Sequence, residues 1–290
     1  MLVPLLTIGT TSAVAAVGLT AYLRGRAKWQ TVKDDMDAAE RRLLAAAPTT
    51  TQTFDPAQLA DLPAPAQRWL RRAIAEGTEI PSSVEIEVEG AMQFGPQDRK
   101  RPLTASTVIV PSSGYLWRER VVPGPIPRSG ILGFVDNIGT VEWSLLDTIR
   151  IVPERVKMDD ERSDGNRSMA GRFTSVLVWT PWAFLPSDQV TWEAIDDRRA
   201  RAQIAFAPET VPVEIEVDDE GRLVNVSIRR WGAKTRDRTF RYFGFRVDAH
   251  DEQTHGGFTI PGRVTSYWAH DDERPSPLMF HHEVKAVRFS

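Results

Sequence analysis

The chain has 290 residues, no cysteine, a formal net charge of -3 and 41% hydrophobic residues. This composition is that of a globular protein large enough to bury a core, and it excludes disulfides, thiolate metal sites and cysteine nucleophiles. The near-neutral charge offers no basic excess for a phosphate backbone, so we expect no nucleic-acid partner.

The N-terminal segment carries no charged residue from Leu2 to Leu23. A helix of this length spans about 33 Å, enough for the roughly 30 Å hydrocarbon core of a bilayer. The sequence therefore predicts a transmembrane anchor over residues 1–24. A cleaved signal peptide is the alternative. It is less favoured because no Lys or Arg precedes the apolar run, and the cleavage-like triplet at residues 13–15 lies in its middle.

Basic side chains follow the predicted anchor at Arg24, Arg26, Lys28 and Lys33. Because such an excess marks the cytoplasmic side, we predict a single-pass membrane protein with its N-terminus outside and its domain on the cytoplasmic side. Apolar residues then recur at spacings of three and four over 29–47, which predicts an amphipathic helix within a juxtamembrane helix and linker, residues 25–53. Alanine at two stripe positions favours a helix lying on its own domain over a dimerising coiled coil.

Residues 54–290 are predicted to form one β-rich domain. A helix over 63–76 ends near Gly77, and the hydrophobic period then changes from 3.6 to 2. Predicted strands cover 84–94, 103–110, 115–122, 131–137 and 140–146. A second helix over 166–179 is stopped by Pro181. Strands resume at 190–194, 200–206, 211–217, 223–229, 239–247, 262–268 and 280–289.

Helices do not alternate with these strands, so parallel βαβ units are excluded. The predicted fold class is mainly β (α+β). We expect a large curved antiparallel sheet or open barrel of about eleven or twelve strands, with two packed helices and a preceding transmembrane helix.

Four blocks resemble a known family in their order and spacing: Leu62–Ile74, Met169–Arg172 leading to Trp179–Pro186, Val190–Asp196, and Gly257–Val264 with Trp268. Together they resemble an uncharacterised prokaryotic family of membrane-anchored domains of unknown function. More distantly, the order of helices and meanders resembles the open β-barrel of bacterial lipoprotein carriers, whose curved sheet holds acyl chains. That second resemblance rests on element order and implies a fold, while the function it implies is an analogy.

Motifs that would specify a reaction do not occur in the sequence, which has no nucleophile elbow, P-loop or dinucleotide fingerprint. His250 and His255 are five apart in a turn-rich stretch, which predicts solvated loop histidines. His281 and His282 are adjacent in a strand and must point to opposite faces. His270 begins an acidic stretch more typical of a charged turn than of a cation site. We therefore expect neither a metal nor a cofactor.

Aromatic side chains are the remaining candidates for function. A curved sheet with many large side chains can line an apolar pocket, so we expect a membrane-tethered binding module for a hydrophobic ligand such as a lipid or an acyl chain. Trp179, Trp182 and Phe184 are predicted to cover the mouth or rim of the concavity, and Phe173 to pack in the core. The predicted ligand-binding residues are Met92, Phe94, Trp117, Trp143, Phe173, Trp179, Trp182, Phe184 and Trp268.

Two alternatives stay open. The first is an enzyme whose residues are scattered over the strands, with Arg172, Arg118, Glu193 and Asp196 as the first candidates, although structural ion pairs explain these charges better. The second is a structural or interaction protein with a filled core and no pocket.

Overall fold

The computed structural model describes residues 5–49, 52–94, 97–122, 124, 126–151, 164–206, 209–233, 239–269 and 278–290, and it describes side chains from residue 17 onward. Its main element is a 13-stranded antiparallel sheet in the order β8-β7-β6-β5-β4-β3-β15-β14-β13-β12-β11-β10-β9. Two meanders, β3 to β8 and β9 to β15, are joined where β15 pairs with β3. The strands are β3 (Val84–Gln93), β4 (Arg101–Val110), β5 (Gly114–Val121), β6 (Arg128–Val135), β7 (Ile138–Leu145), β8 (Ile149–Ile151), β9 (Val190–Ala194), β10 (Arg199–Phe206), β11 (Glu209–Val217), β12 (Leu223–Gly232), β13 (Arg241–His255), β14 (Phe258–Trp268) and β15 (Met279–Phe289).

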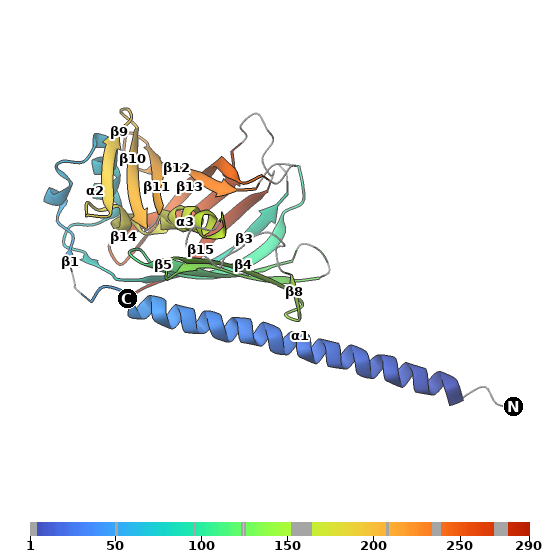
Figure 1. Ribbon diagram of the computed structural model, residues 1–290. Coiled ribbons are helices and arrows are strands. Elements are labelled where there is room, and N and C mark those ends of the chain that lie inside the picture. The colour runs from blue at the N-terminus through green and yellow to red at the C-terminus, as the bar shows by residue number, and fades with distance from the viewer. Residues whose placement is uncertain are drawn as a thin grey trace.

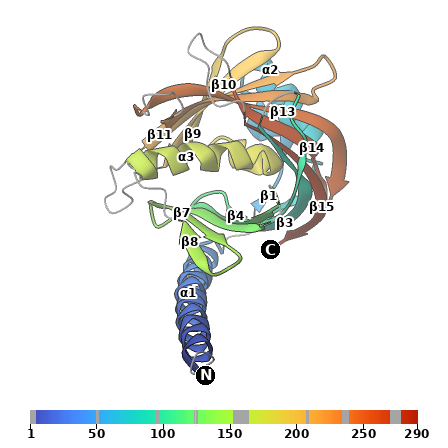
Figure 2. The ribbon, with the colours of Figure 1, turned by 90° about the vertical axis from the view of Figure 1, so that its right-hand side faces the viewer.

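The sheet curls into a half-barrel whose open side is closed by a helix. Figure 2 shows α3 lying across the opening, between the two ends of the curved sheet, and α3 contacts β11 and β12 on one side and β6 and β7 on the other. The predicted curved antiparallel sheet is confirmed. The helical elements are α1 (Leu5–Ala45), η1 (Pro56–Leu59), α2 (Ala64–Ala73), α3 (Asp164–Val176), η2 (Leu177–Trp179) and η3 (Pro181–Phe184), and a separate small sheet pairs β1 (Gln52–Thr53) with β2 (Glu79–Ile80).

Alternating side chains explain why these segments form strands. In β11 the apolar residues Val211, Val213 and Ile215 are buried while the intervening residues are less so, as a sheet with one packed face requires. Short loops match the right-handed twist of the strands at Asp136-Asn137, where both residues have positive φ of 54° and 61°. The half-barrel is therefore built mostly from hairpins between neighbouring strands.

Close backbone approach allows α3 to lie in the half-barrel. A Cβ at Gly139 would lie 2.8 Å from the Cβ of Met169, and a Cβ at Gly171 would lie 3.2 Å from Cγ of Arg230. Asn166 fixes the first turn, because its Oδ1 accepts a hydrogen bond of 2.7 Å from the backbone N–H of Gly139. The two glycines thus let α3 contact both halves of the sheet at once.

Helix α1 lies along the convex face of the sheet, and its N-terminal half projects beyond it (Figure 1). Trp29 is buried with Leu116 and Ile131, and Leu43 is buried in a second small cluster, so the apolar stripe of this helix faces the domain. The predicted anchor, residues 1–24, falls mostly on residues whose side chains are not described. Among the described residues, no helix is both long enough and apolar enough to cross a membrane.

Three details differ from the sequence-based expectations. The described sheet has 13 strands because it includes the short strand β8. The segment from His250 to His255 is the end of strand β13 and not a loop, because it pairs with β14 around a turn at Gly256-Gly257. Finally, α1 runs without a break across the expected boundary at residues 24 and 25. Its C-terminal part is a third helix packed on the sheet, as the apolar stripe over 29–47 predicts.

Candidate functional site

Ionisable and hydroxyl side chains gather inside the half-barrel, where an apolar core is expected. Tyr115 and Glu119 come from β5, Arg230 from β12 and His282 from β15, and all four are buried. Arg172 reaches the same region from α3, with its guanidinium carbon 5.5 Å from the ring centroid of Trp117. We call Tyr115, Glu119, Arg172, Arg230 and His282 the concave cluster.

Arg230 is the most unusual member of the cluster, because its side chain is buried without a carboxylate. The residue is 5% exposed, and its guanidinium carbon lies 4.4 Å from the ring centroid of Phe245 and 4.8 Å from that of Trp268. Its Nε has no hydrogen-bond acceptor. Burial, together with the charge of Arg172, lowers the pKa of Arg230 to about 9.

The carboxyl group of Glu119 lies near Arg172, whose charge acts on it. Its Oε2 accepts a hydrogen bond of 2.7 Å from Nε1 of Trp117. Burial raises the pKa of Glu119, although the charge of Arg172 and the bond from Trp117 act in the opposite direction. At neutral pH the cluster therefore contains two guanidinium groups and a single carboxyl group that is reluctant to ionise.

His282 and Tyr115 are neutral members of the cluster at neutral pH. Burial, with the charge of Arg172 as the next cause, lowers the pKa of His282 to about 3. Burial raises the pKa of the Tyr115 hydroxyl to about 12. Among the described residues, Nε2 of His282 has no hydrogen-bond partner and the proton of the Tyr115 hydroxyl has no acceptor. Unpaired buried polar atoms are uncommon in folded proteins and often mark a functional place.

An apolar groove opens to solvent at one end of the half-barrel, beside η3. Its volume is about 370 Å³, and pockets of about 300–1,000 Å³ are typical of small-molecule sites. Trp182 forms part of its wall and also contacts the core, with ring centroids 4.7 Å from Phe258 and 5.7 Å from Phe289. Apolar residues form the larger part of the lining: Pro48, Ile80, Pro81, Pro111, Trp182, Ala183, Leu185, Pro186, Val190, Ile204 and Phe206. Polar side chains complete it: Gln52, Gln58, Ser82, Ser112, Ser187 and Gln189.

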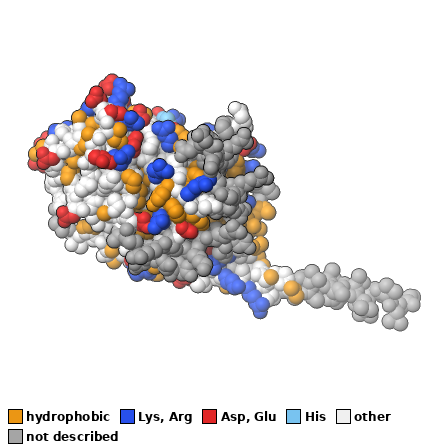
Figure 3. Space-filling view, turned by 45° about the horizontal axis from the view of Figure 1, so that its top comes forward, with side chains coloured by type: hydrophobic (Ala, Val, Ile, Leu, Met, Phe, Trp, Pro, Cys, Tyr) orange, Lys and Arg blue, Asp and Glu red, His pale blue; other side chains and the backbone are white. Residues whose placement is uncertain are grey.

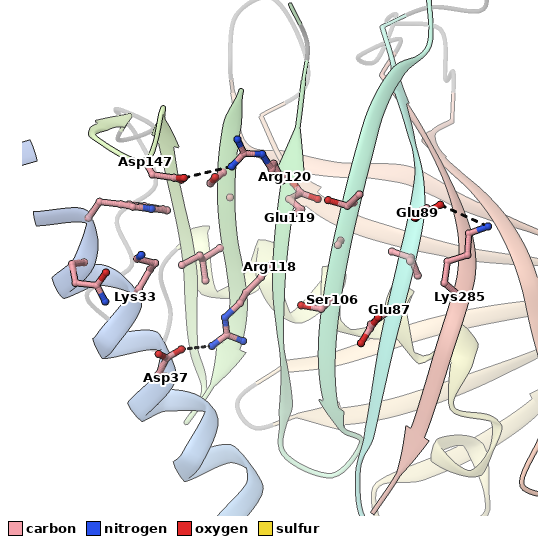
Figure 4. Close-up of a pocket in the computed structure, with 18 residues that line it drawn as sticks. Lys33, Asp37, Glu87, Glu89, Ser106, Arg118, Glu119, Arg120, Asp147 and Lys285 are labelled. Carbon is pink, nitrogen blue, oxygen red and sulfur yellow. Dashed lines mark hydrogen bonds and ion pairs between the residues drawn. The ribbon is translucent and has the colours of Figure 1, made fainter. Parts of the chain in front are cut away.

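A second, larger cleft of about 660 Å³ lies between α1 and the convex face of the sheet. Figure 4 shows Arg118 of β5 directed toward Asp37 of α1, where the two form an ion pair of 2.7 Å. Arg120 lies 3.5 Å from Asp147, and Lys285 lies 3.8 Å from Glu89. Of these three pairs, that of Arg118 with Asp37 joins α1 to the sheet, whereas the other two lie within the sheet and its turns.

Acidic and basic side chains are also mixed elsewhere on the surface. On the face seen in Figure 3, Lys and Arg lie next to Asp and Glu, so this face has no large patch of a single sign. Pairs such as Arg199 with Asp196, at 2.7 Å, are part of this pattern.

The residues predicted to bind a ligand fall into three groups in the structure. Trp117, Phe173, Trp179, Trp182, Phe184 and Trp268 all belong to the main buried core. Met92 lies in a smaller neighbouring cluster, and Trp143 packs against both. Phe94 is 40% exposed and stacks under Arg101, outside the core. The prediction that Trp179 and Phe184 cover the rim is wrong, because both side chains are buried in the core. Trp182 is also more buried than expected for a rim residue, at 6% exposure, yet it does line the groove.

The charged residues singled out as enzyme candidates separate in the structure. Arg118 pairs with Asp37 and Glu40, Glu193 pairs with Arg201 at 2.8 Å, and Asp196 pairs with Arg199. Arg172 alone among them reaches the concave cluster. Ion pairs therefore account for the other three.

Sequence reasoning missed the other members of the concave cluster, although a signal was present. Glu119 has the same parity in its strand as the buried residues Tyr115 and Trp117. Arg230 has the same parity as Val226 and Ile228. A charged residue at an inward position of an otherwise apolar strand is the pattern that would have identified both.

Metal coordination has no support in the described part of the chain, where no three His, Asp or Glu side chains are grouped to hold an ion. His281 and His282 point to opposite faces, as predicted: His282 contacts Trp117, whereas Nε2 of His281 lies 3.0 Å from Oε1 of Gln93. His270 and the acidic residues after it lie outside the described residues.

The protein is a curved antiparallel half-barrel with a helix across its opening and charged side chains buried on its concave face. The chain belongs to the family of unknown function DUF6544, whose family model matches residues 52–277. The resemblance to an uncharacterised family, predicted from the sequence, is thereby confirmed. A comparison with curated proteins found no match.

Three solved structures that the chain resembles are distant in sequence. A LolA superfamily protein from Nitrosomonas europaea has 9% identity and a TM-score of 0.38, over 78% of this chain and 92% of that one. A Vibrio parahaemolyticus domain named for outer membrane lipoprotein sorting has 10% identity and a TM-score of 0.33, over 72% and 85%. A DUF1329 family protein from Desulfovibrio piger has 8% identity and a TM-score of 0.28, over 72% and 86%.

Proposed function

We propose that the half-barrel binds a ligand with an apolar chain, such as a lipid or an acyl chain, which enters at the groove beside Trp182. The observation that carries this proposal is the groove itself, because it is open to solvent yet lined mainly by apolar residues. Exposed apolar surface of this kind costs free energy in water and commonly marks a binding site.

The wall of the groove supports entry toward the core. Trp182 belongs to η3, a short turn that ends at Phe184, and the inner side of its ring contacts Phe258 and Phe289. Its Nε1 is buried without an acceptor. A small outward movement of η3 would connect the groove with the aromatic interior, and the ligand chain would then replace the contacts that Trp182 loses.

The membrane tether predicted from the sequence is part of the same proposal. Val17 is 70% exposed, and Leu19 and Leu23 are also exposed, in the N-terminal half of α1. An exposed apolar helix surface followed by Arg24 and Arg26 suits insertion in a bilayer with the basic end at the cytoplasmic side. We propose that α1 holds the half-barrel next to the membrane from which its ligand comes.

The test measures uptake of the neutral apolar dye Nile red by the full-length protein. We expect a fluorescence increase for the wild type and at least a several-fold weaker affinity for Trp182→Ala, because that change removes one wall of the groove. Trp231→Ala is the matched control, since Trp231 lies outside the groove and contacts Asp164 instead. A wild-type protein that leaves the dye dark would contradict the proposal, and equal losses in both variants would place the entrance elsewhere.

A further inference from the structure

We propose that the ligand carries an anionic oxygen group, a carboxylate or a phosphate, which Arg230 and Arg172 bind on the concave face of the half-barrel. This inference rests on the proposed function, because it names the polar end of the apolar ligand. The concave cluster would hold that end, and the aromatic interior around it would hold the chain.

The buried charge of Arg230 is not balanced by a nearby carboxylate of the described chain. A buried guanidinium group is costly unless a carboxylate or several hydrogen bonds compensate it. Arg230 is only 5% exposed. Within the described part of the chain it forms no ion pair, and its Nε makes no hydrogen bond. Its guanidinium group lies over the rings of Phe245 and Trp268. These cation–π contacts stabilise the charge less than an anionic partner would.

A second cation, Arg172, lies near Arg230. Gly171 approaches Arg230 so closely that a Cβ would lie 3.2 Å from Cγ of Arg230, and Arg172 is the next residue of α3. The charge of Arg172 is accordingly one of the causes that lower the pKa of Arg230, after burial. An anion between them would turn this repulsion into two attractions.

The chemistry of the remaining polar atoms points to the same kind of ligand. The Tyr115 hydroxyl is buried and lies close enough to Arg172 and Arg230 for both to lower its pKa, and its proton has no acceptor among the described residues. Nε of Arg172 also has no acceptor there. These groups donate hydrogen bonds, and an oxyanion offers the acceptors that they lack. The one carboxyl group of the cluster, Glu119, already accepts from Trp117.

The arginines of the convex face show what the concave cluster lacks. Arg288 pairs with Glu85 at 3.1 Å and with Glu87 at 2.8 Å. The sequence thus supplies acidic partners for arginines that face water, whereas the buried Arg230 has none among the described residues. The partner of Arg230 is therefore a bound ligand and not a side chain of the protein.

The experiment compares ligands of one chain length by their displacement of Nile red from the full-length protein. Dodecanoate and dodecyl phosphate are the anionic probes, dodecanol is the neutral one, and inorganic phosphate is the anion without a chain. We expect both anionic amphiphiles to bind at least about tenfold more tightly than dodecanol, since a hydrogen bond to a charged group contributes on the order of one such factor. Free phosphate should displace no dye at the same concentrations.

Two variants then assign the effect to the arginines. Arg230→Gln removes the charge and should abolish the preference for anions while leaving dodecanol affinity within about twofold. Arg172→Gln should reduce the preference in the same direction. Arg118→Gln is the control, because that arginine lies on the convex face. Removing an unpaired buried charge is not expected to unfold the protein, and the unchanged dodecanol affinity reports that the fold is intact.

The possible failures are distinguishable. If dodecanol binds as tightly as dodecanoate, the anion site is wrong while the proposed apolar ligand stands. A preference for anions that survives in both Arg230→Gln and Arg172→Gln also overturns the inference. If free phosphate competes as well as dodecyl phosphate, the site binds a small anion and not an amphiphile. If none of the amphiphiles binds, the proposed function itself fails.

Discussion

The two faces of the sheet treat arginine in opposite ways. On the convex face, Arg118 and Arg288 are partly exposed and each reaches two carboxylates. On the concave face, Arg230 is buried between two aromatic rings, and its Nε has no acceptor. Water and a paired acid make the first arrangement inexpensive, whereas the second lowers the stability of the fold.

The contrast indicates which parts of the molecule stabilise the fold and which could bind a ligand. The aromatic core of the concave face supplies the stability that tolerates a few unpaired charges, as seen in the stacking of Tyr115 with Phe173 at 5.6 Å. The convex ion pairs position α1 and contribute little free energy. Substitutions on the two faces should therefore differ in how much they lower the free energy of unfolding.

The largest effect is expected at the centre of the concave core. Phe173 is completely buried, and its ring centroid lies 4.6 Å from Phe206 and 6.2 Å from Phe134. Phe173→Ala should lower the free energy of unfolding by about 3–5 kcal/mol, because it removes these contacts and leaves a cavity. Chemical denaturation of the full-length protein measures this loss.

The matched control for this change is Phe94→Ala. Phe94 is exposed and lies outside the core, so its truncation should change the free energy of unfolding by less than about 1 kcal/mol. Equal losses in the two variants would show that the concave core does not carry the stability assigned to it.

An intermediate effect is expected from acid, through His282. The pKa of its imidazole is about 3 in the folded protein, against an ordinary value of 6.5. Between these pH values the unfolded chain binds a proton that the native protein does not, so the free energy of unfolding falls as the pH falls, by up to about 1.4 kcal/mol per pH unit. The raised pKa of Glu119 has the opposite sign, because the native protein then holds its proton above pH 4.5.

The test is the slope of stability against pH in wild type and in His282→Gln. We expect the variant to lose much of the acid-induced destabilisation between about pH 6.5 and pH 3, whatever its stability at neutral pH. His250→Gln is the control, since His250 is an exposed residue of β13. An unchanged slope in His282→Gln would mean that His282 is accessible to water and that the concave cluster is wet.

Local patterns predicted most of the fold. Alternation gave the strands around Val211 and Ile215, and the stripe containing Met169 and Phe173 gave the mid-chain helix, because each depends on residues close in sequence. The pairing of β15 with β3 was out of reach, since it joins Phe289 to Val84 across almost the whole domain. The polar end of β13 also escaped, because its pairing with β14 outweighs its turn-like composition.

The candidate site was less predictable than the fold. The sequence singled out Trp182 near the mouth, and the structure places it in the wall of the groove, but its depth depends on Phe258 and Phe289 from distant strands. The concave cluster combines residues of β5, α3, β12 and β15. Only the tertiary arrangement brings Arg172 near Arg230, so no spacing in the sequence could indicate that pair.

The smallest effect is expected for the ion pairs between α1 and the convex face. The side chain of Arg118 is 31% exposed and that of Asp37 is 53% exposed, so solvent screens their attraction. Arg118→Ala should lower the free energy of unfolding by only about 0–1 kcal/mol, and by still less at high salt. Trp29→Ala is the informative partner, because Trp29 is buried against Leu116 and Ile131 and its loss should weaken the docking of α1 far more. Hydrogen exchange along residues 25–45, compared in the two variants, measures that docking. If Arg118→Ala released α1 as completely as Trp29→Ala does, the convex pairs would be as important as buried ones, and the contrast between the two faces would not hold.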